Sequence, residues 1–215
     1  MGFISDSISG TTISGGSFND LNLGLGAGSI STNIAIGSGT LSSNTYGTYN
    51  TALGSDALKN NTTGNYNVAL GYSALKYFQS SGNVAFGQNA LKGQKIYNNY
   101  TYTYDYSTGA NNVALGPSAL QNNTTGTDNI ALGRDALASN TTGAYNTGLG
   151  YGVQSGDYSG SLILGAGAAA AANGQLALGS VSYPLGPVAT ESLTSNKTLE
   201  INLNGNLYKV LMYQP

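Results

Sequence analysis

The stretch Asn67-Val-Ala-Leu-Gly-Tyr-Ser-Ala-Leu75 contains the unit that decides the fold of this chain. Its first five residues return in closely similar form along most of the sequence. The pentads are Asn33-Ile-Ala-Ile-Gly37, Asn50-Thr-Ala-Leu-Gly54, Asn67-Val-Ala-Leu-Gly71, Asn83-Val-Ala-Phe-Gly87, Asn112-Val-Ala-Leu-Gly116, Asn129-Ile-Ala-Leu-Gly133 and Asn146-Thr-Gly-Leu-Gly150, with a weaker copy in Gln175-Leu-Ala-Leu-Gly179. Self-similarity at a short fixed period indicates a repeat fold.

The spacing of the pentads selects the kind of repeat. Their final glycines are mostly 17 residues apart, as from Gly54 to Gly71 and from Gly133 to Gly150. This period is too short for a helix pair, a leucine-rich repeat or a propeller blade. It fits one coil of a narrow parallel β-solenoid, with about two short strands and two turns in each coil. We therefore expect an all-β solenoid over residues 21–180.

Turn residues separate two apolar patches in each unit. The glycine of the pentad permits backbone conformations that other residues resist, so it marks a corner before the second patch, Ala-Leu. In three units this patch is followed by Asn-Thr-Thr-Gly, which favours an outer turn. The same segments match the N-glycosylation pattern at Asn61, Asn123 and Asn140. We favour the turn interpretation, because Asn, Thr and Gly are ordinary turn residues.

Both faces of each pentad strand are apolar. In Val68-Ala-Leu70, the alternation of a strand sends Val68 and Leu70 to one face and Ala69 to the other. We expect both faces to be buried and the Val, Ile and Leu of the pentads to belong to the core. A narrow coil has one interior, so a second copy of the chain would cover the other face, with the small Ala allowing a close approach. Which face looks into the coil stays open at this point.

The composition excludes several classes of protein. Charged residues make up 7% of the chain, against roughly 25% in an ordinary soluble domain. The chain has no His and no Cys, and its formal net charge of -2 includes only seven scattered basic residues. We therefore expect no enzymatic activity, no catalytic residues, no metal and no cofactor. Nucleic acid is an unsuitable partner, and no stretch approaches the roughly 20 apolar residues of a membrane span.

The pentad followed by x-x-Ala-Leu resembles the head repeats of trimeric autotransporter adhesins, which also occur in trimeric fibre proteins of phages and large viruses. The resemblance covers roughly residues 22–180. It implies a left-handed parallel β-roll in which three chains pack as an intertwined or side-by-side homotrimer. It also implies the display of an adhesive surface on a virion or tail fibre or, alternatively, on a bacterial cell. No heptad stalk, membrane anchor or signal peptide is evident, which favours a fibre component or a fragment of a longer adhesin.

The chain divides into four expected parts. Residues 1–20 form an irregular N-terminal segment, residues 21–180 the β-roll, and residues 181–196 a connector containing Pro184 and Pro187. Residues 197–215 contain two alternating runs around Asn204-Gly205, which predicts a C-terminal β-hairpin. Because a lone hairpin is marginally stable, we expect it to cap the fibre and help to set the trimer.

One insertion interrupts the repeats, at residues 93–106. There, tyrosines alternate with Thr and Asp, so one extended strand would place four rings on one face. Insertions in solenoids emerge as surface loops, often on the binding face, and Tyr combines a large contact area with a polar tip. The candidate ligand-binding residues are Tyr97, Tyr100, Tyr102, Tyr104, Asp105 and Tyr106.

Three functions follow from these patterns. The first is a non-enzymatic adhesin or receptor-binding fibre head that binds a host cell-surface glycan or protein through the insertion. In the second, the tyrosines pack on a neighbouring subunit and the chain is a structural spacer of a fibre. The third is a polysaccharide-degrading tailspike, which would need two carboxylates about 5 to 9.5 Å apart. Asp56 and Asp135 occupy equivalent turn positions in the repeats, so they do not suggest such a pair.

Overall fold

The computed structural model describes residues 16–18, 21–179, 198–203 and 206–211. The chain divides into two compact units, Met1–Leu185 and Gly186–Pro215. The expected connector 181–196 and the Asn204-Gly205 turn lie outside the described residues, as does most of the segment 1–20.

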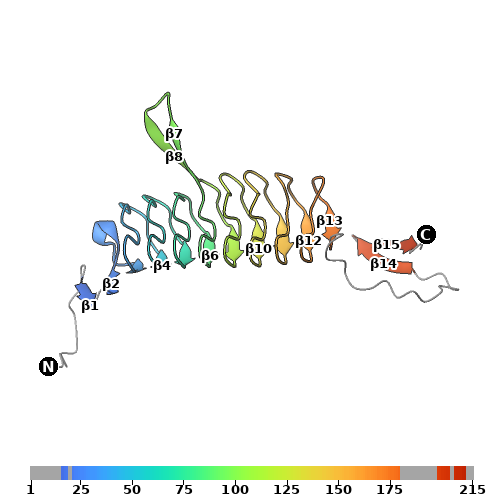
Figure 1. Ribbon diagram of the computed structural model, residues 1–215, viewed down its shortest axis with the longest axis horizontal. Helices are drawn as coiled ribbons and strands as arrows, with labels where there is room; N and C mark the ends of the chain where they lie inside the picture. Colours follow the sequence, from blue (N-terminus) through green and yellow to red (C-terminus); the bar gives the residue numbers. More distant parts are fainter. Residues whose placement is uncertain (1–15, 19–20, 180–197, 204–205, 212–215) are drawn as a thin grey trace. The chain divides into compact units, whose positions relative to one another are not determined.

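The first unit is a parallel β-solenoid, as the pentads predict (Figure 1). Strand β1 (Gly16–Phe18) pairs antiparallel with β2 (Leu21–Gly24), and β2 pairs antiparallel with β3. A 3-10 turn, η1 (Ala27–Ser29), lies between β2 and β3. From β3 onward each of the eight pentads forms one strand, the segment Ser161-Leu-Ile-Leu-Gly165 forms a ninth, and each strand pairs in parallel with that of the next coil. These strands are β3 (Ile34–Ile36), β4 (Thr51–Leu53), β5 (Val68–Leu70), β6 (Val84–Phe86), β9 (Val113–Leu115), β10 (Ile130–Leu132), β11 (Thr147–Leu149), β12 (Leu162–Leu164) and β13 (Leu176–Leu178).

The insertion does not break the stack of coils. Strand β6 pairs directly with β9, with Val84 opposite Val113 and Ala85 opposite Ala114. The insertion forms a separate two-stranded sheet from β7 (Lys95–Asn98) and β8 (Thr103–Tyr106). The solenoid therefore continues in register on both sides of the hairpin.

The small residue of each pentad faces the coil interior, which corrects one of our expectations. Ala69 and its equivalents are buried, whereas the flanking Val68 and Leu70 are only partly covered. The reason is space, because the Leu of the second patch already fills the narrow interior. At the one pentad with Gly in the middle, Gly148, a Cβ atom would lie 2.8 Å from Cγ of Leu137. Small residues therefore occupy the middle position opposite the buried leucines, whereas the larger Ile163 is buried at this position in β12, beyond Leu137, the last of these leucines among the described residues.

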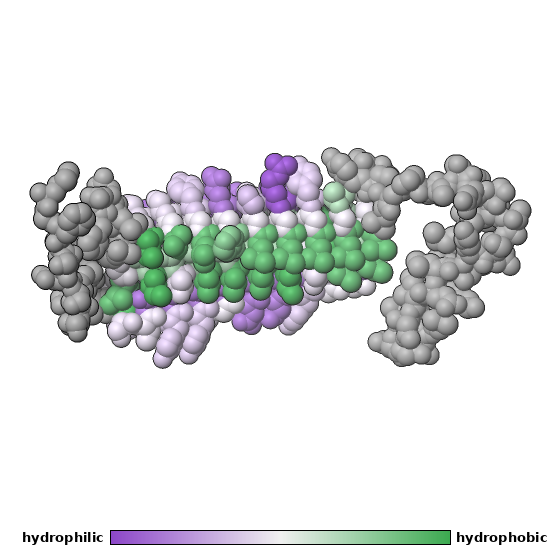
Figure 2. All heavy atoms as spheres, turned by 90° about the horizontal axis from the view of Figure 1, so that it is seen from below, coloured by the Kyte–Doolittle hydropathy of each residue, from purple (hydrophilic) through white to green (hydrophobic). Residues whose placement is uncertain are grey.

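The Val, Ile and Leu of the pentads are therefore not core residues. They form two rows on the outer face of β3 to β13, and Figure 2 shows this face as a continuous hydrophobic band. We call this band the apolar stripe. One row is Ile34, Thr51, Val68, Val84, Val113, Ile130, Thr147, Leu162 and Leu176, and the other is Ile36, Leu53, Leu70, Phe86, Leu115, Leu132, Leu149, Leu164 and Leu178. Each of these side chains is exposed or half-buried in the single chain.

The second patch supplies the large core residues. Leu58, Leu75 and Leu120 are fully buried, yet each has a left-handed backbone, with φ between 50° and 52°. This conformation costs an L-residue roughly 1–2 kcal/mol, whereas burying a Leu side chain contributes about 1.5–3 kcal/mol. The burial thus outweighs the strain, and a leucine makes this tight corner in the coils as far as Leu137.

The first Asn of each pentad forms a buried ladder that the sequence did not predict. Asn33, Asn50, Asn67, Asn83, Asn112, Asn129 and Asn146 are at most 1% exposed. In each step, Oδ1 of one Asn accepts a hydrogen bond from the backbone N–H of the next, as from Asn129 to Asn112 at 3.0 Å. The Nδ2 group of Asn112 also donates to the carbonyl of Gly126 at 2.9 Å. The ladder satisfies buried backbone groups in neighbouring coils, which would otherwise cost about 1–3 kcal/mol each.

The second unit contributes two described strands. Strand β14 (Thr198–Leu203) pairs antiparallel with β15 (Asn206–Leu211), with Glu200 opposite Lys209.

Candidate functional site

The hairpin β7–β8 leaves the solenoid at a modified coil. Asn44 and Asn61 stack in neighbouring coils, and Phe78 occupies the next equivalent position. Phe78 is 1% exposed and forms a parallel bridge with Ser107, where the hairpin returns to the coil. A Cβ atom on Gly93, where the hairpin departs, would lie 2.7 Å from the Phe78 ring. The Phe78 ring thus packs directly beneath the base of the hairpin.

The hairpin corrects the expected arrangement of the tyrosines. Only Tyr104 and Tyr106 lie on β8, while Tyr100 and Tyr102 lie in the connecting turn. Tyr102 has a left-handed backbone with φ of 55°. The extended strand is interrupted there because the chain reverses to pair Tyr97 with Tyr104. Four rings therefore do not line up on one strand face.

A different set of residues shares a face. Lys95 lies opposite Tyr106, and Tyr97 lies opposite Tyr104, so these four side chains project from the same side of the two-stranded sheet. We call them the lysine–tyrosine face. The rings of Tyr97 and Tyr104 meet edge to face, with centroids 5.3 Å apart. The Lys95 ammonium lies 3.9 Å from the Tyr104 ring centroid and 5.9 Å from that of Tyr106.

The opposite face and the turn are held by polar contacts. Asp105 lies opposite Ile96 on the other side of the sheet. Its Oδ2 atom accepts a hydrogen bond from Nδ2 of Asn98 at 3.0 Å, and Oδ1 of Asn98 accepts one from the backbone N–H of Tyr100 at 2.9 Å. Tyr100 is 96% exposed at the tip. Of the six predicted site residues, the structure gathers Tyr97, Tyr104 and Tyr106, and separates Tyr100, Tyr102 and Asp105 from them.

The structure exposes a second group of tyrosines that the sequence analysis did not predict as site residues. Tyr49, Tyr66 and Tyr145 each precede a pentad Asn, and all three are exposed with φ between 56° and 59°. The rings of Tyr49 and Tyr66 stack in parallel, with centroids 5.0 Å apart. Their recurrence one residue before the pentad was the available signal. These rings lie on the coils, as an exposed aromatic group separate from the hairpin.

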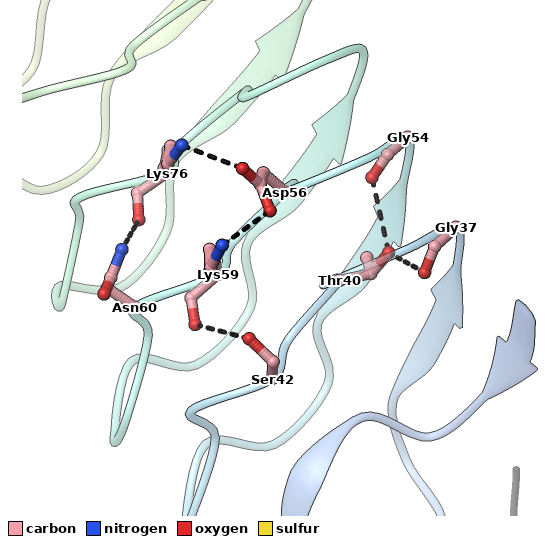
Figure 3. Close-up of polar contacts among 8 residues, drawn as sticks. All are labelled: Gly37, Thr40, Ser42, Gly54, Asp56, Lys59, Asn60 and Lys76. Atoms are coloured by element: carbon pink, nitrogen blue, oxygen red, sulfur yellow. Dashed lines mark hydrogen bonds and ion pairs between the residues drawn. The ribbon is translucent and has the colours of Figure 1, made fainter.

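The carboxylate of Asp56 belongs to an ion-paired corner of the coils (Figure 3). It accepts hydrogen bonds from Nζ of Lys76 at 2.8 Å and from Nζ of Lys59 at 2.9 Å. The hydrogen bond from Lys76, helped by Lys59, lowers the pKa of Asp56 despite partial desolvation, and Asp56 raises the pKa of Lys76. The three charges tie two coils together at the corner.

The carboxylate of Asp157 accepts hydrogen bonds from the turn at Thr141 and Thr142 in the preceding coil. Burial acts to raise its pKa, but hydrogen bonds from the backbone N–H groups of Thr141 and Thr142 and from the Thr141 hydroxyl outweigh it, so the pKa is lowered. A general acid needs the opposite shift, towards neutral pH. The lowered pKa values keep Asp56 and Asp157 ionised at neutral pH, and both carboxylates hold turns through hydrogen bonds.

The possible glycosylation sites face inward. Asn61, Asn123 and Asn140 are fully buried. The Nδ2 atom that would carry the sugar donates hydrogen bonds inside the coil, as from Asn61 to Oδ1 of Asn44 at 3.1 Å and to the carbonyl of Gly64 at 3.0 Å. In the folded coil these residues act as turn residues, and the nitrogen is not accessible for attachment.

Comparison of the chain with models of known protein families, with curated protein sequences and with solved structures gives no match. The resemblance to adhesin heads therefore rests on the pentads and on the solenoid that they form. Among the residues that the structure describes, no helix is long and apolar enough to cross a membrane.

Proposed function

We propose that this chain is a non-enzymatic attachment protein, an adhesin or receptor-binding fibre head. Three copies pack along their apolar stripes into a left-handed β-roll homotrimer and present their hairpins to a glycan or protein on a host cell. The trimer belongs on the surface of a virion or tail fibre or, alternatively, on a bacterial cell. Handedness and the number of chains come from the resemblance of the pentads to adhesin head repeats.

The apolar stripe supports self-association. Nine strands about 4.8 Å apart extend the stripe over roughly 40 Å, and its two rows make a flat area on the order of 500 Å². The largest apolar patch of a typical monomer covers roughly 300–600 Å² and is often a functional surface, so a stripe of this size is a candidate for an interface. Only Thr51 and Thr147 interrupt the apolar rows. A second copy of the same stripe matches both its length and its composition.

The position of the hairpin supports attachment. It leaves the coils at the edge opposite the strands that carry the apolar stripe (Figure 1). Copies joined through their stripes would therefore direct their hairpins outward. Several weak contacts made by one trimer act together, because the second and third contacts are intramolecular. The single observation that carries the proposal is an exposed aromatic hairpin on an otherwise uninterrupted scaffold.

The two carboxylates with a shifted pKa, Asp56 and Asp157, favour binding over catalysis. Asp56 is neutralised by two lysines, and hydrogen-bond donors hold Asp157 ionised. Neither group has the raised pKa of the acid that protonates a glycosidic oxygen. A tailspike activity is therefore the weaker alternative.

A structural spacer is the stronger alternative, because β6 and β9 pair as though the hairpin were absent. Replacing residues 95–106 with the two-residue turn Asn-Gly separates the two functions. Circular dichroism and sedimentation should show an unchanged fold and oligomer. If attachment is the function, binding of the purified protein to host cells falls to background. Unchanged cell binding by the folded variant would contradict attachment through the hairpin and favour the spacer.

A further inference from the structure

We propose that the lysine–tyrosine face of the hairpin binds an acidic saccharide, a sugar unit that carries a carboxylate. Lys95 pairs with the carboxylate, and the rings of Tyr97, Tyr104 and Tyr106 pack on the sugar and hydrogen-bond to its hydroxyls. The biological role of this site rests on the attachment function proposed above, while the binding itself is measured independently of it.

The cation of this face is available to an anion. Among the described residues, no carboxylate lies within ion-pair distance of Lys95. The one acid of the hairpin, Asp105, lies on the opposite face and accepts a hydrogen bond from Asn98. Lys95 instead rests over the rings of Tyr104 and Tyr106. A cation in this position is held by the ring quadrupole while its remaining N–H donors stay free.

The aromatic residues supply the rest of a sugar site. Tyr97 is 48% exposed and Tyr104 50% exposed, so both rings keep about half of their surface free. The electron-rich face of an aromatic ring attracts the polarised C–H groups of a sugar ring, and the phenol hydroxyl donates and accepts hydrogen bonds. The rings of Tyr97 and Tyr104 are inclined at 61° to each other. They therefore offer a sugar two inclined surfaces rather than one flat surface.

The size and charge of the face argue against larger partners. Two paired four-residue strands present on the order of 150 Å² on one side, whereas a stable protein interface takes about 800 Å² from each partner. A nucleic acid would need several cations along its backbone, and this face offers one. A single charged sugar unit fits both the area and the charge.

The test measures binding of defined saccharides to the intact chain in its native oligomeric state. Saturation-transfer NMR titrations at low salt would use sialyllactose and digalacturonate as carboxylated probes and lactose as the uncharged counterpart of sialyllactose. We expect at least one acidic probe to bind about tenfold more tightly than lactose, as one charge-assisted hydrogen bond supplies. If neither acidic probe binds more tightly than lactose, the proposal is wrong.

A matched pair of lysine substitutions separates a built site from general charge attraction. Lys95→Gln should lower the affinity for the acidic probe to that of lactose. Lys92→Gln removes the same charge from a lysine on the coil beside the hairpin and should leave the affinity unchanged. Equal weakening by both variants would overturn the proposal. Because Lys95 is exposed, its replacement should not unfold the chain, which circular dichroism checks.

The aromatic part of the site has its own variant. Tyr104→Leu removes the ring beneath the ammonium and should weaken both acidic and neutral saccharides, unlike Lys95→Gln, which affects only the acidic ones. If binding of the acidic probe is unaffected in Tyr104→Leu, the ring has no part in the site and the proposal fails.

The failure of this inference can be distinguished from failure of the attachment function. If the hairpin replacement abolishes cell binding while Lys95→Gln leaves it intact and no acidic probe binds, the attachment function stands and the saccharide proposal falls. If acidic probes bind through Lys95 but the hairpin replacement leaves cell binding unchanged, the saccharide site stands and the attachment function falls.

Discussion

The coils bury residues at equivalent positions in successive turns, whereas strands β7 and β8 of the hairpin have only exposed or half-buried side chains. Each coil residue is held by equivalent residues above and below it, as Asn112 is by Asn83 and Asn129. The hairpin residues contact one another across a single strand pair. Coil positions are thus constrained by stability, while hairpin positions are free to serve recognition. Substitutions in the two regions should therefore have different consequences.

The largest expected effect is at the glycine corner of a coil. Gly116 has φ of 136°, and a Cβ atom there would lie 2.5 Å from the carbonyl oxygen of Gly133 in the next coil. Gly116→Ala combines backbone strain of about 1–3 kcal/mol with a clash against backbone that cannot move aside. We expect a loss of several kcal/mol or failure to fold, measured by urea denaturation. Gly152→Ala is the matched control, because Gly152 also has a positive φ but no atom within 4 Å of the built Cβ.

The asparagine ladder should show the next largest effect. Asn112→Ala leaves the backbone N–H of Asn129 without its partner inside the coil, while the carbonyl of Gly126 keeps its hydrogen bond from Asn123. With about 1–3 kcal/mol for an unsatisfied buried group, we expect the free energy of unfolding to fall by about 2 kcal/mol. Asn122→Ala, which removes an exposed Asn with one hydrogen bond to Ala138, should cost less than about 1 kcal/mol. Equal losses in the two variants would show that the ladder contributes nothing special.

The ion-paired corner should give the smallest effect and a dependence on pH. Because the pKa of Asp56 is lowered in the folded chain, its contribution is present at neutral pH and is lost as the pH falls below about 4. The raised pKa of Lys76 adds a contribution that is lost only at strongly alkaline pH. Lys76→Met should lower stability by about 1 kcal/mol at pH 7 and flatten the decline in acid. An unchanged acid profile would mean that the pair does not contribute.

The period of 17 residues was sufficient to predict the solenoid, because only short strands and turns fit within it. The orientation of the strands was not predictable from alternation alone, since Val68, Ala69 and Leu70 are all apolar. Volume decides it, because the buried Leu75 and its equivalents leave room only for a small residue, and the larger Ile163 is buried at this position only beyond Leu137, the last of these leucines among the described residues. The ladder was overlooked because Asn is common in turns, although its return at the first pentad position was visible.

The position of the hairpin was predictable from the sequence, but its internal strand pairing was not. The insertion was located from the break in the repeats, but the alternating tyrosines favoured one long strand. The reversal near Tyr102 and the pairing of Tyr97 with Tyr104 depend on contacts between residues distant in the insertion. Lys95 was not predicted as a site residue, because only the cross-strand register places it on the tyrosine face.

The coils carry the apolar stripe and the hairpin does not. One isoleucine from each region therefore gives a matched pair of substitutions. Ile130 lies in the stripe on β10 and is 40% exposed, while Ile96 lies on the hairpin and is 54% exposed. If the stripe is an interface, Ile130→Asp buries a charge between copies and dissociates the oligomer. Ile96→Asp should leave the oligomer intact. Dissociation by neither variant, or by both, would contradict the distinction.

Sedimentation equilibrium of the intact chain measures directly whether three copies associate. We expect a single folded species of three times the 21.8 kDa chain mass at protein concentrations down to the micromolar range, and a species of lower mass when Ile130 is replaced by Asp. A folded monomer of 21.8 kDa, stable with its apolar stripe exposed to water, would contradict it.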